Sequence, residues 1–232
     1  MKASTATATC TATSATALAT VVTQRRQFLH ALAIAYGIFW LALAWSPRYR
    51  QDWALENVLV LLFAALLWHH RRRVPLSRTA NGLIAAFLLL HAVGAHYTYS
   101  EVPYREWLHT LGFINDPGSR NHFDRLVHFC YGLLLAMPVR ELCHRTLSLS
   151  PGLSYGLPLL LLSFGSTVYE WVEWGAAIMF GGDLGIAYVG SQGDPWDAQK
   201  DMLLATSGAV LGLSLTFWRS RARPNANHTS GA

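Results

Sequence analysis

Long apolar runs alternate with short polar breaks along the chain. The hydrocarbon core of a bilayer is about 30 Å thick, so a helix of roughly 20 apolar residues crosses it. Pro and Gly residues in the breaks end such helices. The pattern predicts an all-α fold, a polytopic membrane bundle of about six transmembrane helices, over residues 28–45, 53–68, 80–97, 122–142, 155–180 and 197–218.

Arginines recur at every second break between these runs. Cytoplasmic loops of membrane proteins carry an excess of Lys and Arg. The N-terminus, the loops after the second and fourth runs, and the C-terminus are therefore predicted to lie in the cytoplasm. This N-in, C-in orientation depends on Arg25, Arg26, Arg71, Arg72, Arg73, Arg78, Arg140, Arg145, Arg219, Arg221 and Arg223.

The two ends of the chain differ from its middle. Residues 1–26 are rich in Ala, Ser and Thr and are predicted to form a disordered tail; the sequence leaves open whether this tail is processed. Residues 27–218 form the predicted six-helix transmembrane domain. Residues 219–232 form an Arg-rich cytoplasmic tail.

The composition excludes a soluble globular protein. Hydrophobic residues make up 52% of the chain and charged residues 13%, against roughly 25% charged residues in an ordinary soluble domain. The net charge of +5 follows from the arginines that set the orientation, so no nucleic-acid partner is expected. The expected partner is the lipid bilayer, and the oligomeric state is left open.

The acidic residues are distributed in the opposite way to the arginines. Of 13 Asp and Glu residues, only Glu141 falls on the cytoplasmic side of the predicted topology. Residues three or four apart share one face of a helix. Three such pairs fall at the extracytoplasmic ends of different helices: Asp124 with His128, Glu170 with Glu173, and Asp197 with Asp201.

Charged groups within a membrane normally face the bundle interior and pair with one another or with water. Carboxylates crowded together repel one another unless protons or a cation neutralise them. A divalent metal ion would do so, because Asp, Glu and His are common ligands of such ions. The predicted metal ligands are Asp124, His128, Glu170 and Asp197.

If the protein is an enzyme, a metal-bound water could be activated with Glu173 or Asp201 as general base. The sequence leaves open whether it is an enzyme, and it indicates no cofactor other than this metal. A water-filled vestibule of hydrogen-bonded acids, without a metal, is an alternative. The roles of four further polar residues are also open: His91, His96, Gln192 and Gln199.

Several motifs resemble the YjdF-like bacterial inner-membrane proteins. These are FDRLVHF at 123–129, MPVREL at 137–142, YEWVEW at 169–174 and GSQGDPWDAQKDM at 190–202, preceded by HAVGAHYTYSEVP at 91–103. The resemblance covers about residues 30–218 and implies a multi-pass protein of the bacterial inner membrane, without an assigned activity. A more distant similarity to VanZ-like membrane proteins departs from their Glu-Gln step, where this chain has Glu170 and Glu173.

These observations predict an integral inner-membrane protein with an Asp/Glu/His cavity that faces away from the cytoplasm. The cavity is expected to bind or process a lipid or another envelope component, with a divalent metal as candidate cofactor. Two other functions stay open: a proton- or cation-coupled transporter or permeability factor, and a partner-binding membrane protein without a catalytic site.

Overall fold

The computed structural model describes residues 4–115, 120–180 and 191–222, and of these the side chains from residue 20 onward except that of residue 180. The described residues form helices and short connections, without strands. Long helices span Ser4–Ala44 (α1), Arg50–His70 (α2), Arg78–Tyr97 (α3), Phe123–Thr146 (α5), Leu153–Phe180 (α6) and Asp197–Arg221 (α8). A 3-10 turn, Tyr99–Glu101 (η1), and a short helix, Tyr104–Thr110 (α4), lie between α3 and α5.

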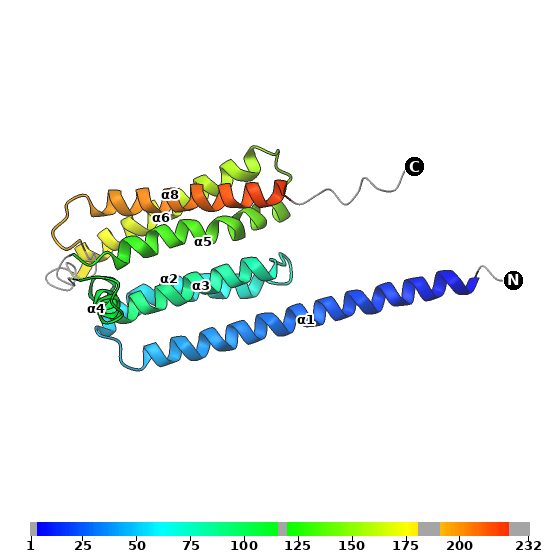
Figure 1. Cartoon of the computed structure of the whole chain (residues 1–232), viewed down its shortest axis with the longest axis horizontal. Helices are drawn as coiled ribbons and strands as arrows, with labels where there is room; N and C mark the ends of the chain where they lie inside the picture. Colours follow the sequence, from blue (N-terminus) through cyan, green and yellow to red (C-terminus); the bar gives the residue numbers. More distant parts are fainter. Residues whose placement is uncertain (1–3, 116–119, 181–190, 223–232) are drawn as a thin grey trace.

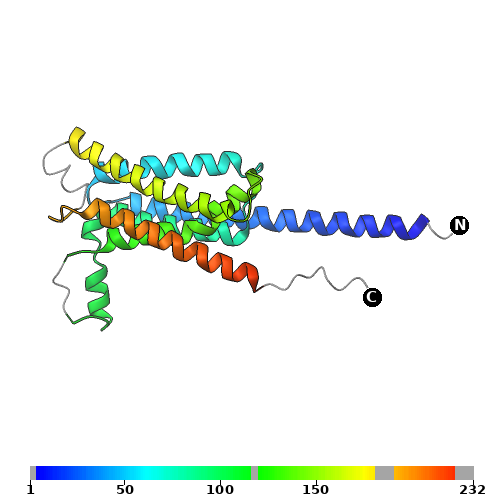
Figure 2. The same cartoon turned by 90° about the horizontal axis from the view of Figure 1, so that it is seen from above.

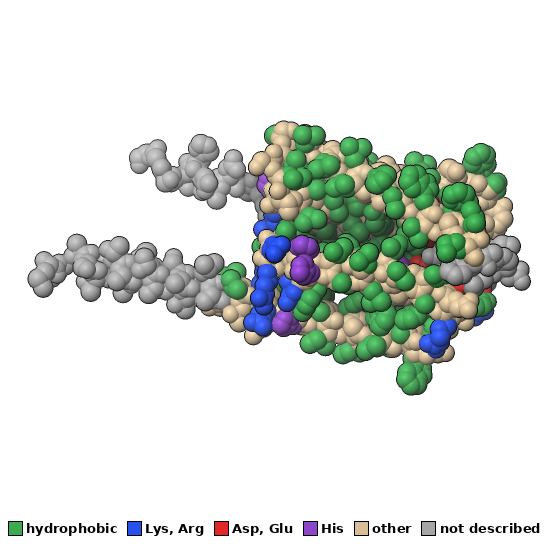
Figure 3. Space-filling model, turned by 180° about the vertical axis from the view of Figure 1, so that it is seen from behind, with side chains coloured by type: hydrophobic (Ala, Val, Ile, Leu, Met, Phe, Trp, Pro, Cys, Tyr) green, Lys and Arg blue, Asp and Glu red, His purple; other side chains and the backbone are tan. Residues whose placement is uncertain are grey.

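The six long helices form two layers that meet where α3 packs against α5 (Figure 1). Helices α1, α2 and α3 make up one layer, and α5, α6 and α8 make up the other. The α2–α3 and α5–α6 connections lie at the same end of the bundle as the end of α8 (Figure 1). Figure 3 shows Lys, Arg and His side chains gathered at this end, which we call the basic end.

Within the described residues, five helical stretches are long and apolar enough to cross a membrane: Thr20–Ala44, Arg50–His70, Arg78–Tyr97, Phe123–Thr146 and Asp197–Arg221. The all-α, multi-pass membrane fold is thereby confirmed. Helix α6 is 28 residues long and carries Glu170 and Glu173, and it is not among these five stretches. A sixth crossing by α6 and the N-in, C-in orientation stay predictions.

Helix α1 begins at Ser4, so the structure is helical over most of the segment for which the composition predicts a disordered tail. Alanine, which recurs throughout residues 4–26, is the strongest helix former. A helix also extends more easily than it nucleates, and the apolar part of α1 supplies the nucleus. The proposed division into three domains at residues 26 and 218 stays a prediction.

Small residues allow α5 and α8 to pack with their backbones in close contact. Ala205 and Ala209 of α8 are fully buried against α5. A methyl group on Gly212 would come within 2.6 Å of the Ala136 side chain. Stripes of small residues are a common way to join transmembrane helices. This contact fixes how the acidic ends of α5 and α8 lie relative to each other.

A polar contact at the basic end ties the start of α3 to the end of α5. The Glu141 carboxylate accepts hydrogen bonds from the backbone N–H and the hydroxyl of Ser77, both at 2.7 Å. The same Ser77 hydroxyl caps α3 by accepting from the Ala80 backbone N–H. Glu141 also pairs with Arg145 at 2.7 Å. The one acid predicted on the cytoplasmic side therefore joins two helices.

Candidate functional site

Three aspartates come together where α5 meets α8, at the end of the bundle away from the basic end. Carboxylate oxygens of Asp124, Asp197 and Asp201 lie within 4.8 Å of one another. We call these residues the aspartate trio. Asp197 and Asp201 are one turn apart on α8 and are 5% and 2% exposed. The close α5–α8 packing brings Asp124 to them.

His128 connects the trio to α6. Its Nε2 atom lies 3.6 Å from Asp124 Oδ1, one turn earlier on α5, and 3.4 Å from Glu170 Oε1 on α6. His128 is 6% exposed and Glu170 is 8% exposed. Three helices thus contribute ionisable groups to one buried cluster.

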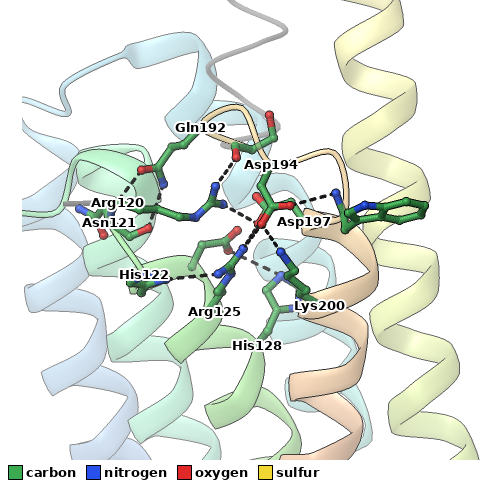
Figure 4. A network of polar contacts seen from close by, with 12 residues as sticks. Arg120, Asn121, His122, Arg125, His128, Gln192, Asp194, Asp197 and Lys200 are labelled. Carbon is green, nitrogen blue, oxygen red and sulfur yellow. Dashed lines mark hydrogen bonds and ion pairs between the residues drawn. The ribbon is translucent and has the colours of Figure 1, made fainter.

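Three cations surround the outer rim of this cluster (Figure 4). Arg120 and Arg125 contact Asp197 Oδ1 at 2.5 and 2.8 Å. Arg125 and Lys200 contact Asp194 Oδ2 at 2.6 and 2.5 Å. These ion pairs hold the segment before α8 against the start of α5.

The rim holds Asp194 in its charged form. A hydrogen bond from Lys200, together with the Trp196 backbone N–H and the Arg125 guanidinium, keeps the pKa of the Asp194 carboxyl well below its usual range. Opposite charges and hydrogen-bond donors favour a carboxylate over the neutral acid. The rim is therefore a set of three cations and two carboxylates around the segment that leads into α8.

The inner acids lack such cations. No ion pair in the described part of the chain joins an Arg or Lys to Asp124, Glu170, Glu173 or Asp201. Asp201 Oδ1 is buried and makes no hydrogen bond within the described residues. Glu170 Oε1 is also buried without a hydrogen bond there, although it lies 3.4 Å from His128 Nε2. Buried polar atoms are normally hydrogen-bonded, so Asp201 Oδ1 in particular is open to a proton, a water molecule or a cation.

The structure brings together most of the predicted site residues. Asp124 and Asp197 belong to the trio, and His128 and Glu170 lie directly beside Asp124. Asp201, which the sequence indicates as a general base, is a member of the trio itself. Glu173 is 7% exposed and interacts electrostatically with Asp124 and Glu170, but it lies outside the trio.

A cavity of about 320 Å³ adjoins this cluster between α2, α3, α5 and α6. Its walls are apolar along most of their length. The polar groups that line it gather at the end near the trio: Glu56, His91, Tyr99, Asp124, His128 and Tyr169. Asp124 and His128 therefore belong both to the acidic cluster and to the cavity wall.

The sequence analysis did not identify two tyrosines of this cavity. The Tyr169 hydroxyl donates a 2.7 Å hydrogen bond to Glu56 Oε2 and so joins α6 to α2. The Tyr99 hydroxyl hydrogen-bonds His91 Nδ1. Tyr169 is one helical turn before Glu173, and this spacing could have marked it. Tyr99 follows the left-handed residue Thr98 (φ 58°) in a turn, and periodicity gives no signal there.

The four polar residues whose roles were open lie in different surroundings. His91 lines the cavity, whereas the ring of His96 hydrogen-bonds the Leu43 carbonyl at 2.8 Å and ties α3 to α1. Gln192 bridges to the backbone of Asn121 through two hydrogen bonds. Gln199 is exposed on α8. His91 is the one of the four with access to the candidate site.

Comparisons with known proteins agree with the membrane fold. Residues 28–222 match the family described as "Predicted membrane protein (DUF2238)". The chain is 31% identical over 193 residues to the "Inner membrane protein YjdF" of Escherichia coli (strain K12), which covers 81% of this chain and 88% of that protein. No solved structure matches. The comparisons do not support the VanZ-like similarity.

The family match, the inner-membrane relative and the apolar helices together confirm a multi-pass protein of the inner membrane. They also confirm the resemblance to YjdF-like proteins. The chain belongs to the DUF2238 family of membrane proteins.

Proposed function

We propose that this protein binds a divalent metal ion in the aspartate trio and uses that site to bind or process a lipid or another component of the cell envelope. Three carboxylates with oxygens within 4.8 Å of one another are the main support. The unpaired, buried Asp201 Oδ1 is a second support, because an anionic oxygen in that position needs a positive partner.

Most of the ligands in this proposal come from two helices, α5 and α8. Asp124, Asp197 and Asp201 supply carboxylate oxygens, and His128 supplies an imidazole nitrogen beside Asp124. Glu170 completes the cluster from α6 through its contact with His128. Asp197 Oδ1 is already bonded to two arginines, so Oδ2 is its available atom.

The metal would supply a Lewis acid and an activated water. Asp201 then acts as a ligand, which leaves Glu173 as the proposed general base. Glu173 belongs to α6, on the other side of the cluster from α8. Only 7% of this residue is exposed, so its carboxylate is shielded from bulk water. A proton transfer would run between this carboxylate and the substrate or water held at the trio.

The test is metal analysis of the purified protein together with thermal unfolding in the presence and absence of a chelator. Metal is expected to co-purify, and the chelator should lower the melting temperature of the wild type, because a bound ion stabilises only the state that binds it. Asp201→Asn and His128→Ala should lose the metal and the chelator effect. Glu173→Gln should retain metal, with an affinity weaker by about 10- to 100-fold if this carboxylate orients the ligands.

Glu106→Gln is the matched control, because Glu106 is an exposed acid at the start of α4, on the same side of the bundle. It should keep the metal and the chelator effect. If the cluster holds only protons, no metal co-purifies and the chelator has no effect. Asp201→Asn would then raise the melting temperature by relieving repulsion between carboxylates, and the proposal would be wrong.

A further inference from the structure

The cavity beside the acidic cluster is long as well as apolar. Asp124 lines one end and Leu142 lines the other, and both belong to α5. Eighteen residues of helix at 1.5 Å per residue correspond to about 27 Å. The hydrocarbon core of a whole bilayer is about 30 Å thick, so one leaflet contributes roughly 15 Å. A space of this length is long enough for the hydrocarbon chain of a lipid.

The cavity opens to the outside of the bundle between α2 and α6. Leu59 and Phe63 of α2 and Leu161 of α6 line the cavity, yet they are 40%, 38% and 47% exposed. These two helices lie on the same side of the α3–α5 contact (Figure 2). The face seen in Figure 3 has a hollow lined by hydrophobic side chains. In a membrane, this opening faces lipid chains.

We propose that the cavity between α2, α3, α5 and α6 holds one acyl chain of a phospholipid, which enters sideways between α2 and α6. This proposal names the ligand of the site in the proposed function and rests on that function for the position of the headgroup. An apolar space that opens into a bilayer is filled by hydrocarbon, because water would lack hydrogen-bonding partners along its walls.

The polar end of the cavity determines which way the lipid lies. Glu56, Asp124, His128 and Tyr169 gather at one end, and the opposite end near Leu76 and Leu142 is apolar. The lipid headgroup therefore lies beside the aspartate trio, and the end of the acyl chain lies toward the basic end. In the predicted orientation, this is how a lipid of the outer leaflet lies.

Photo-crosslinking tests this placement on the full chain. The protein is placed in vesicles of phosphatidylethanolamine and phosphatidylglycerol that contain a phosphatidylethanolamine with a diazirine on its acyl chain. Label is expected on Leu88 and Leu135, which line the cavity and are only 8% and 6% exposed. Leu160, 68% exposed on the outside of α6, should be labelled by any surrounding lipid.

The position of the diazirine tests the direction of the chain. A diazirine near the carbonyl should label Val127, and one near the end of the chain should label Val139. Both residues line the cavity on α5, at opposite ends. The reverse order would overturn the proposed orientation. Label confined to outward-facing residues such as Leu160 would overturn the proposal altogether.

A blocking variant has a matched control on a neighbouring helix. Ser166 is buried and lines the cavity, whereas Ser207 is exposed on α8. Ser166→Phe should reduce the labelling of Leu135 several-fold without changing that of Leu160, and Ser207→Phe should change neither. If Ser166→Phe does not fold, Val139→Phe narrows the same cavity from α5. Unchanged labelling of Leu135 in a folded blocking variant would contradict the proposal.

Metal analysis and photo-crosslinking together separate this proposal from the metal site. If no metal binds but Leu88 and Leu135 are labelled, the metal-dependent function is wrong and the acyl-chain site stands. If metal binds and label stays on the outside of the bundle, the acyl-chain site is wrong and the metal site stands.

Discussion

At the scale of single residues, the site divides into an outer rim and an inner cluster. Arg120, Arg125 and Lys200 pair with Asp194 and Asp197 at 2.5 to 2.8 Å. The inner carboxylates of Asp201 and Glu170 retain oxygens without hydrogen-bond partners in the described structure. Proximity of opposite charges stabilises the rim, whereas the inner cluster needs protons or a cation. The two parts should respond differently to pH.

The rim predicts a pH-dependent contribution from Asp194. Its pKa is lowered in the folded protein, so its stabilising effect is present above the unfolded value of about 3.9 and is lost as pH falls toward the folded value. The melting temperature of Asp194→Asn should therefore lie further below that of the wild type at pH 7 than at pH 3. Thermal unfolding at both pH values measures this difference.

The exposed acid Glu106 provides the control for this comparison. Glu106→Gln should leave the melting temperature close to that of the wild type at both pH values, because exposed charges contribute little. A gap between Asp194→Asn and the wild type that is equal at pH 7 and pH 3 would show that Asp194 does not act through its charge.

At the scale of helices, the close packing of α5 against α8 places the trio. A methyl group on Gly132 would collide with the backbone of α8 at Ala205 and Ala209. Gly208 likewise lies against the α5 backbone at Phe129 and Leu133. Because Asp124 lies two turns before Gly132, any separation of the two helices moves it away from Asp197 and Asp201. The packing of small residues and the acidic site are therefore coupled.

Gly132→Ala tests this coupling. The added methyl group must push α5 and α8 apart, and overpacking of this kind costs about 1–3 kcal/mol. We expect a lower melting temperature and, if the trio binds metal, a lower metal content in the purified protein. Thermal unfolding and metal analysis of the same preparation provide both measurements.

Gly175→Ala is the matched control, because a methyl group on this residue of α6 meets nothing within 4 Å. Alanine favours a helix over glycine by up to about 1 kcal/mol, so this variant should be as stable as the wild type or more so. If Gly132→Ala behaves like Gly175→Ala, the backbones of α5 and α8 are not held in close contact.

At the scale of the whole molecule, charge separates the two ends of the bundle. Arginines and histidines gather at the basic end (Figure 3), and the aspartate trio lies where α5 and α8 begin, at the other end. Positively charged ends of membrane proteins remain in the cytoplasm. This arrangement predicts that the trio faces away from the cytoplasm.

Cysteine labelling tests the orientation in intact cells, in a background without the native cysteines. Ser191→Cys lies beside the rim and should react with a membrane-impermeant maleimide added from outside. Arg72→Cys and Arg221→Cys lie at the basic end and should react only after the membrane is permeabilised. Labelling of Ser191→Cys from the cytoplasmic side alone would reverse the orientation and place the trio in the cytoplasm.

The apolar runs and the arginines between them determined the class of the protein and its main helices. Transmembrane helices satisfy their own backbone hydrogen bonds, so local composition is enough to locate them. The observed α2, α3, α5, α6 and α8 begin and end within a few residues of the predicted runs. Local composition does not decide the state of residues 4–26, which continue α1 in the structure, because a run rich in Ala, Ser and Thr is compatible with either state.

Helical spacing also indicated which polar residues share a helix face. It correctly paired Asp124 with His128 and Asp197 with Asp201. Spacing within one helix cannot tell how neighbouring helices are rotated and how close they come. The tertiary structure decided that Asp201 joins the trio, that Glu173 does not, and that Tyr169 reaches across to Glu56. It also decided where the cavity lies, because its walls come from two helix pairs, α2 with α3 and α5 with α6, and exist only once these pairs pack.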